Sequence, residues 1–368
     1  MVTDGHSIHR LGMGTERMKK LKIGYWPLSP NFRSAGDRRR LIFWAHARGH
    51  TIVTDLNQSV DVIVASENTD FNSRYFVQKR VPIIFDLIDA YLSPLNSYDD
   101  LARGIAKRLS GQISGNIKPF SRHVSDFCMN STAVICSSVE QEQIIKNYNT
   151  NTYIILDSHD EIPFIDARHQ KAETLNERRI LWEGQPATIR GVQQISSILA
   201  QISKSNNLRF DFVTDEKYFQ LLNKYIQKNT WDLLKKDLSQ IADLVRIVPW
   251  SPDHLVECAQ RSAVAMIPID LSVPMQNLKP ENRLLIMWRL GLPCLTSPSP
   301  AYARVALKAG VNAVCENPQV WLESFNRILN DPEFAYDEIV GGQNYLRENH
   351  NSAILLSKWD AAFESVMG

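Results

Sequence analysis

The chain has 368 residues, with 41 Lys or Arg against 40 Asp or Glu, so its formal net charge is +1. This balance creates no global field that would attract nucleic acid. At 44% hydrophobic residues, the composition also excludes a disordered chain or a coiled coil. The length corresponds to roughly two domains of about 150 residues each.

The first twenty residues are polar and contain glycine, so we expect a polar tail over 1–20 and structure from Leu21 onward. This tail lacks the apolar core of a signal peptide, and no later run approaches the ~18 apolar residues of a membrane span. The five cysteines show no CxxC spacing, which suits free thiols in a reducing compartment. We therefore expect a cytoplasmic location.

From Leu21 onward, short runs rich in β-branched residues alternate with helix-length segments. In the first half these runs are Leu21–Tyr25, Thr51–Thr54, Asp61–Ala65, Val81–Phe85, Ala133–Cys136 and Tyr153–Leu156. In the second half they are Ile180–Trp182, Phe210–Val213, Val245–Val248, Ala263–Pro268, Leu292–Thr296 and Ala313–Cys315. This alternation is typical of βαβ units and parallel sheets. Twelve strands are too many for one typical doubly wound sheet.

The prediction is therefore an α/β chain with two Rossmann-like domains, over 21–165 and 166–350. The charged segment Ser158–Arg179, which contains Pro163, is the expected linker. At the first helix, Ser34 and Asp37 match a capping box, and Gly49 is the expected stop. The last segment, 351–368, has one apolar helical face, which could pack on the second domain or cross back to the first.

Common cofactor and metal motifs are missing. A GxG at residues 12–14 lies in the tail without a preceding strand, and there is no GxxxxGK[ST], GxSxG or HExxH. The nine histidines do not cluster at metal-ligand spacing. We therefore predict no resident cofactor and no metal site.

Two loops that follow predicted strands suggest an anion site, because ligands bind at the carboxyl ends of parallel strands. After Ile180–Trp182, Gly184 permits close backbone approach and Arg190 begins a helix, where backbone amides favour an anion. Further on, Lys279 and Arg283 lie four apart at a helix start and could reach one phosphate. The alternatives are an ordinary βα turn and a solvated, capped helix start.

The segment KPENRLLIMWRLGLPCLTSPSPAY, from Lys279, resembles the donor-binding motif of GT-B fold glycosyltransferases. ILWEGQPATIRG resembles the glycine-bearing first loop of the same domain, and VRIVPWSPDHLVECAQRSAVAMIPI the segment that borders the nucleobase. KIGYWPLSPNFRSAGDRRRLIFWAHARGH resembles the opening of the acceptor domain. The resemblance spans nearly the whole chain from Leu21 and is closest to the large retaining group that uses nucleotide diphosphate sugars.

The chain departs from that group at its Glu-x7-Glu pair. Leu278 and Ile286 occupy the two positions, while Glu281 is nearby but out of register. Arg283 matches the basic residue that divergent members carry eight positions before the glycine of Gly-x-Pro, here Gly291.

The resemblance implies a metal-independent, retaining transfer of a sugar from a nucleotide diphosphate donor to a glycan or lipid-linked acceptor, with two domains facing across a cleft. The implied donor-binding residues are Gly184, Arg190, Trp250, Lys279, Glu281, Asn282 and Arg283, and Gly36 and Arg38 would border the acceptor side. An inverting reaction would need a base, for which Asp86 and Asp89 are candidates because they follow a strand. Helix capping or loop solvation is the alternative for both.

A basic face between Leu101 and Arg122 could contact an anionic membrane that carries the acceptor, or could be a solvated helix. Its cations are Arg103, Lys107, Arg108, Lys118 and Arg122. Two other functions stay open. A nucleotide-sugar 2-epimerase would convert the donor without an acceptor, and an inactive GT-B-like binding or scaffold protein would bind without turnover.

Overall fold

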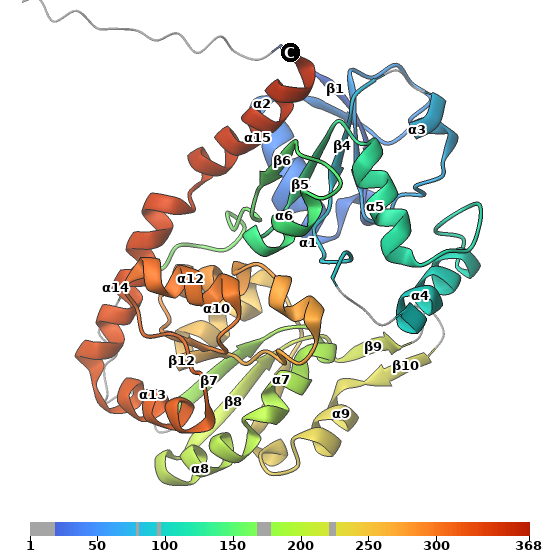
Figure 1. Ribbon diagram of the computed structural model, residues 1–368. Coiled ribbons are helices and arrows are strands. Elements are labelled where there is room, and N and C mark those ends of the chain that lie inside the picture. The colour runs from blue at the N-terminus through green and yellow to red at the C-terminus, as the bar shows by residue number, and fades with distance from the viewer. Residues whose placement is uncertain (1–18, 79–80, 94–96, 168–177, 221–225) are drawn as a thin grey trace, which may run out of the picture.

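The computed structural model describes residues 19–78, 81–93, 97–167, 178–220 and 226–368. The predicted tail over 1–20 therefore lies almost wholly outside the described residues. Residues 168–177 of the predicted linker also lie outside them. Figure 1 shows two domains, one above the other, each built around its own sheet.

The first sheet has six parallel strands in the order β2-β1-β3-β4-β5-β6. The strands are β1 Lys22–Trp26, β2 Thr51–Val53, β3 Val62–Ser66, β4 Ile83–Asp86, β5 Ala133–Cys136 and β6 Thr152–Ile154. Strands β3, β4 and β5 are buried along their whole length. This is why they appear in the sequence as continuous apolar runs rather than alternating ones.

The second sheet has five parallel strands in the order β11-β8-β7-β12-β13. They are β7 Arg178–Glu183, β8 Leu208–Val213, β11 Val245–Val248, β12 Ser262–Ile267 and β13 Cys294–Thr296. The prediction of two Rossmann-like α/β units is confirmed. The run Ala313–Cys315 forms an isolated bridge between Thr296 and Val314 instead of a strand. A two-stranded antiparallel sheet of β9 Lys217–Gln220 and β10 Ile226–Asn229 was not predicted.

Helices connect the strands. In the first domain they are η1 Pro30–Phe32, α1 Ala35–Asp37, η2 Arg38–Ile42, α2 Phe43–Arg48, α3 Arg74–Gln78, α4 Ser97–Leu109, α5 Phe120–Asn130 and α6 Val139–Ile145. The second domain begins with η3 Pro186–Thr188, α7 Ile189–Gln194, α8 Ser196–Asn206, α9 Thr230–Asp237, η4 Ala242–Leu244 and α10 Pro252–Arg261. It continues with η5 Pro274–Leu278, α11 Asn282–Arg289, α12 Pro300–Ala309, α13 Pro318–Asn330 and α14 Pro332–Asn349, and α15 Ser352–Met367 ends the chain.

The first helix differs from its prediction. Asp37 does not complete a capping box: it is fully buried and accepts hydrogen bonds from the Tyr25 hydroxyl at 2.7 Å and the Leu28 amide at 2.8 Å. The helix continues through a π-helical turn, η2, in which Arg40 has φ −119° and ψ −108°. Gly49 ends the helix in the left-handed region (φ +68°), as predicted.

The last helix, α15, lies against the first domain. In Figure 1, α14 runs beside the second domain and α15 continues beside the first. Trp359 and Phe363 of α15 belong to the core around β1, β3 and β5, and the Phe363 ring stacks on Trp44 at 4.0 Å. Of the two placements that the sequence left open, the structure has the crossing to the first domain. None of the helices in the described ranges is long and apolar enough to cross a membrane.

Candidate active site

The two domains meet at the edges where their strands end. The Lys279 ammonium forms an ion pair with Asp89, and the Ser138 hydroxyl donates to the Leu278 carbonyl at 2.7 Å. Beside them, Arg304 of α12 forms an ion pair with Glu140 of α6. These contacts join the loop after β4 and the start of α6 to the segment that leads into α11.

Glu183, the last residue of β7, organises the second-domain side of this junction. Its carboxylate accepts hydrogen bonds from Arg283 Nε at 3.2 Å and from Trp250 Nε1 at 3.1 Å. At Gly184, a Cβ atom would lie 2.8 Å from Thr188 Oγ1 and 3.1 Å from Arg283 Nη2. The glycine therefore lets Thr188, Trp182 and the Arg283 guanidinium pack closely around this point of the backbone. The structure brings the predicted Gly184, Trp250 and Arg283 together, whereas Glu183, within the quoted loop, was not singled out.

Arg190 lies on α7 and has a different carboxylate partner. Its side chain is 69% exposed, and Nε is 2.9 Å from Oδ2 of the buried Asp270. Although burial alone would raise the pKa of Asp270, hydrogen bonds from Ser272 and Gln194 and the charge of Arg190 lower it. The following Gly191 has a packing role, because a Cβ there would lie 2.2 Å from the Pro268 carbonyl oxygen.

The start of α11 carries buried polar atoms without partners. Glu281 Oε2, Asn282 Oδ1 and Arg283 Nη2 are buried and have no hydrogen-bond partner within the described ranges. Burial raises the pKa of Glu281. Because buried polar atoms in native proteins are nearly always paired, this group of three suggests that a ligand completes the site.

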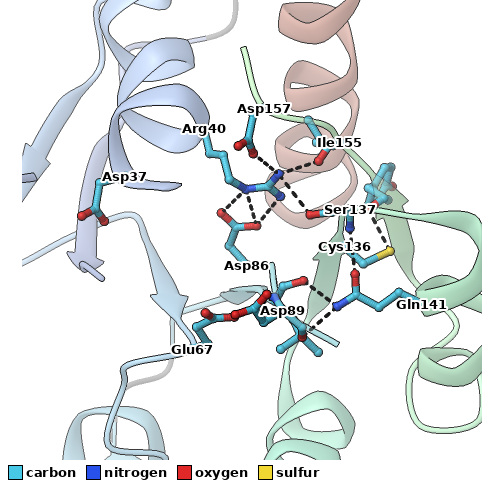
Figure 2. A network of polar contacts seen from close by, with 12 residues as sticks. Asp37, Arg40, Glu67, Asp86, Asp89, Cys136, Ser137, Gln141, Ile155 and Asp157 are labelled. Atoms are coloured by element: carbon cyan, nitrogen blue, oxygen red, sulfur yellow. Dashed lines mark hydrogen bonds and ion pairs between the residues drawn. The ribbon is translucent and has the colours of Figure 1, made fainter. Parts of the chain in front are cut away.

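Asp86, a candidate base because it was expected to follow a strand, is buried at the end of β4 instead. It is the last residue of β4, is 1% exposed, and holds Arg40 with Nη2–Oδ1 at 2.6 Å and Nε–Oδ2 at 3.0 Å (Figure 2). The π-helical turn places Arg40 inward, where it also donates to the Ile155 carbonyl at 2.6 Å. Burial raises the pKa of Asp86, and the charge of Arg40 opposes this shift. Asp86 therefore has a structural role.

Asp89 lies three residues further on, and its carboxylate is 33% exposed. Its amide donates to Glu67 Oε2 at 2.8 Å, and its carbonyl accepts from Gln141 Nε2 at 3.1 Å (Figure 2). Glu67 directly follows β3 and is 8% exposed. Burial, and then the charge of Asp89, raise the pKa of Glu67 to about 8. Sequence reasoning missed Glu67, although searching after every strand would have found it.

Gly36 and Arg38 lie on the first-domain side. A Cβ at Gly36 would lie 2.5 Å from Leu28 Cδ1 and 2.9 Å from Ile88 Cδ1, so this glycine borders the loop that carries Asp89. The Arg38 guanidinium is 3.1 Å from Glu161, in the connection between the domains. Arg38 therefore supports the domain junction.

The surface of α4 differs from the basic face that was predicted. Lys107 donates to Gln112 at 2.6 Å, Arg103 lies over the Tyr91 ring, and Lys118 pairs with Asp126. Arg108 and Arg122 are exposed, and so are several apolar side chains. Among the described residues, six of the eight large exposed hydrophobic side chains lie between 98 and 129: Tyr98, Leu101, Ile105, Leu109, Ile117 and Met129. In the described ranges, no group of three or more His, Cys, Asp or Glu is placed to hold a metal ion.

No protein-family model and no curated protein matches the chain. Among solved structures, Anabaena Alr3699/HepE in complex with UDP and glucose matches with a TM-score of 0.63 at 12% identity, over 94% of this chain and 100% of that one. WaaG, a glycosyltransferase involved in lipopolysaccharide biosynthesis, matches with a TM-score of 0.58 at 12% identity, over 94% and 100%. TarM matches with a TM-score of 0.55 at 10% identity, over 82% of this chain and 54% of TarM, so the chain spans about half of TarM. At these identities the likeness concerns the fold, which is GT-B.

Proposed function

We propose that this chain, whose fold is GT-B, is a glycosyltransferase that moves a sugar from a nucleotide diphosphate to a glycan or lipid-linked acceptor. The observation that carries the proposal is the start of α11, where three buried polar atoms lack partners within the described ranges and Arg283 lies directly against the backbone at Gly184. HepE, which has the same fold, has been solved with UDP-glucose. This supports a nucleotide sugar as the donor.

The donor site would stabilise the leaving diphosphate with the chain's own cations. Arg283, which pairs with Glu183 and whose buried Nη2 has no partner within the described ranges, and the exposed Arg190 would supply the guanidinium groups. Guanidinium groups match phosphate oxygens. Donors aimed at developing negative charge are each worth ~2.7–4 kcal/mol of transition-state stabilisation. We therefore infer a reaction that needs no metal. Trp250, held by Glu183, would border the nucleobase.

We further propose that the transfer retains the anomeric configuration. In a front-face reaction the departing phosphate oxygen takes the proton of the acceptor hydroxyl, so no protein base is required. This agrees with the buried Asp86 being held by Arg40. NMR of the product anomer tests this point: an inverted product would require a base from the first domain.

For the acceptor, we propose a lipid-linked sugar at the cytoplasmic face of an anionic membrane. The exposed stripe of α4 includes Tyr98 and Leu109 at 84% and 74% exposure, and the same helix carries the exposed cation Arg108. An apolar stripe with nearby cations is typical of a helix that lies in a membrane interface. The same helix is linked to the loop that follows β3. Lys107 of α4 donates to Gln112, and Gln112 donates to the Glu67 carbonyl at 3.3 Å.

The first experiment is calorimetric titration of the protein with UDP, GDP, ADP, CMP and dTDP. We expect one diphosphate to bind, and Arg283→Ala and Arg190→Ala each to weaken that binding by at least about tenfold, or 1.4 kcal/mol. Arg261→Ala is the matched control, since it removes an arginine that pairs with Glu257 on the same helix, away from the candidate site.

Unchanged affinity in both site variants would contradict the proposed phosphate site. If the donor is converted without any acceptor, the epimerase function is supported instead. Binding without turnover against a panel of acceptors would favour the scaffold function.

A further inference from the structure

Lys279 forms an ion pair across the junction between the two domains. Its ammonium pairs with Asp89 of the first domain, and both side chains are about one-third exposed (34% and 33%). Lys279 directly follows η5 and lies three residues before the first residue of α11, the helix that carries Arg283. A lysine ammonium on a flexible four-carbon stem can change partners while the backbone stays in place.

Asp89 cannot move together with Lys279, because the loop that carries Asp89 is hydrogen-bonded to the first domain. The Gln141 amide donates to the Leu87 carbonyl at 2.9 Å and to the Asp89 carbonyl at 3.1 Å. In addition, the Glu67 carboxyl group accepts a hydrogen bond from the Asp89 amide. Gln141 is itself buried and accepts from the Ser137 amide at 3.0 Å. The Asp89 carboxylate therefore keeps its place when its cation leaves.

We propose that Lys279 is shared between the donor and acceptor sites: the donor diphosphate draws its ammonium away from Asp89, and the freed carboxylate then binds an acceptor hydroxyl. This inference rests on the proposed function and assigns Asp89 as an acceptor-binding residue that becomes available once the donor is bound. Donor and acceptor binding would then be coupled, and such coupling is reciprocal. Donor should bind first.

Glu67 fits this arrangement. Its carboxyl group faces Asp89 and Lys279, with Asp86 of β4 and Lys107 of α4 also acting on it. Burial and the charge of Asp89 raise the pKa of Glu67 to about 8, and the charge of Lys279 opposes this rise. When Lys279 leaves, the pKa rises further, so Glu67 stays protonated near neutral pH.

The test is a double-mutant cycle on UDP affinity, or on the affinity for whichever diphosphate the wild type binds. We expect Asp89→Asn to tighten binding about threefold to tenfold, because Lys279 no longer has to leave a carboxylate. Lys279→Met should weaken binding. In the Lys279→Met background, Asp89→Asn should have no effect.

Glu140→Gln is the matched control, since it removes the neighbouring ion pair between the domains, with Arg304, and leaves Lys279 in place. If Glu140→Gln tightens binding as much as Asp89→Asn, domain loosening explains the effect and the inference is overturned. Weaker or unchanged binding in Asp89→Asn also overturns it. If no diphosphate binds the wild type, the proposed function itself fails. If a diphosphate binds and Arg283→Ala weakens that binding, the proposed donor site stands, and an unexpected result for Asp89→Asn then counts against the shared role of Lys279 alone.

Discussion

At the scale of single residues, Arg40 is held entirely by the first domain. It is fully buried and pairs with Asp86, with the Asp157 carboxylate at 3.3 Å as a second partner. Removing one partner of a buried ion pair leaves an uncompensated charge, which costs about 3–5 kcal/mol. We therefore expect Arg40→Met to lower the free energy of unfolding by that amount, measured by urea denaturation.

The companion variant Asp86→Asn tests the corrected role of this carboxylate. Arg40 keeps Asp157 as a partner in this variant, so we expect a smaller loss of stability and unchanged diphosphate affinity. An unchanged unfolding midpoint in Arg40→Met would show that the pair contributes nothing to the fold.

These residues also show where prediction from sequence ends. Ligands bind at the carboxyl ends of parallel strands. This rule led to Gly184, Arg283 and Asp89, because it requires only the order of strands along the chain. It placed Asp86 wrongly, since no local pattern reveals the π-helical turn that brings Arg40 inward. Glu183 escaped notice because its role comes from partners 67 and 100 residues away, Trp250 and Arg283.

At the scale of elements, periodicity located the buried strands well and the exposed ones poorly. The first-domain core strands β3, β4 and β5 are continuous apolar runs, which is why they were predicted. The β9–β10 pair was missed because segments such as Ile226–Asn229 are largely polar, and residues 227–229 are exposed. For the last helix, its apolar face was visible, but a helical face does not identify the surface that covers it.

The crossing of α15 leads to a prediction about local stability. Trp359 is fully buried in the first-domain core, and Trp44 donates from Nε1 to Asp360 of the same helix at 2.7 Å. Trp359→Ala should cost about 3–5 kcal/mol and should increase amide exchange in α2, β5 and β6 of the first domain. Hydrogen exchange measured segment by segment checks this.

Trp321→Ala is the matched control, because it removes a tryptophan of α13 that is buried in the second-domain core. It should increase exchange in α8 and β12 and leave the first sheet protected. If Trp359→Ala instead increases exchange mainly in the second domain, α15 does not belong to the first-domain core.

At the scale of the whole molecule, the chain passes between the domains at two places that lie together. It leaves the first domain through residues 157–162 and returns between α14 and α15 (Figure 1). The His159 and His350 rings lie 4.7 Å apart, and Ser352 donates to Asp160 at 2.7 Å. The two connections therefore share one packed junction.

Both imidazoles of this junction are buried, which makes the junction sensitive to acid. Burial lowers the pKa of His350 to about 4, and burial together with the charge of His350 lowers the pKa of His159 well below 6.5. Between pH 6.5 and 4 the unfolded chain therefore binds more protons than the folded chain, so stability falls as the pH falls. Each pH unit over which one imidazole is protonated only in the unfolded state costs about 1.4 kcal/mol.

His159→Phe should make this pH dependence shallower. Both ring nitrogens of His159 lack a hydrogen-bond partner in the described part of the chain, so an apolar ring of similar shape removes the titration without breaking a bond. We expect the loss of unfolding free energy between pH 6.5 and 4.5, measured by urea denaturation, to be smaller than in the wild type. His46→Gln, which removes an exposed imidazole of α2, is the control and should keep the wild-type slope. If the unfolding free energy of His159→Phe depends on pH as steeply as that of the wild type, the loss of stability in acid arises from groups outside the junction between the domains.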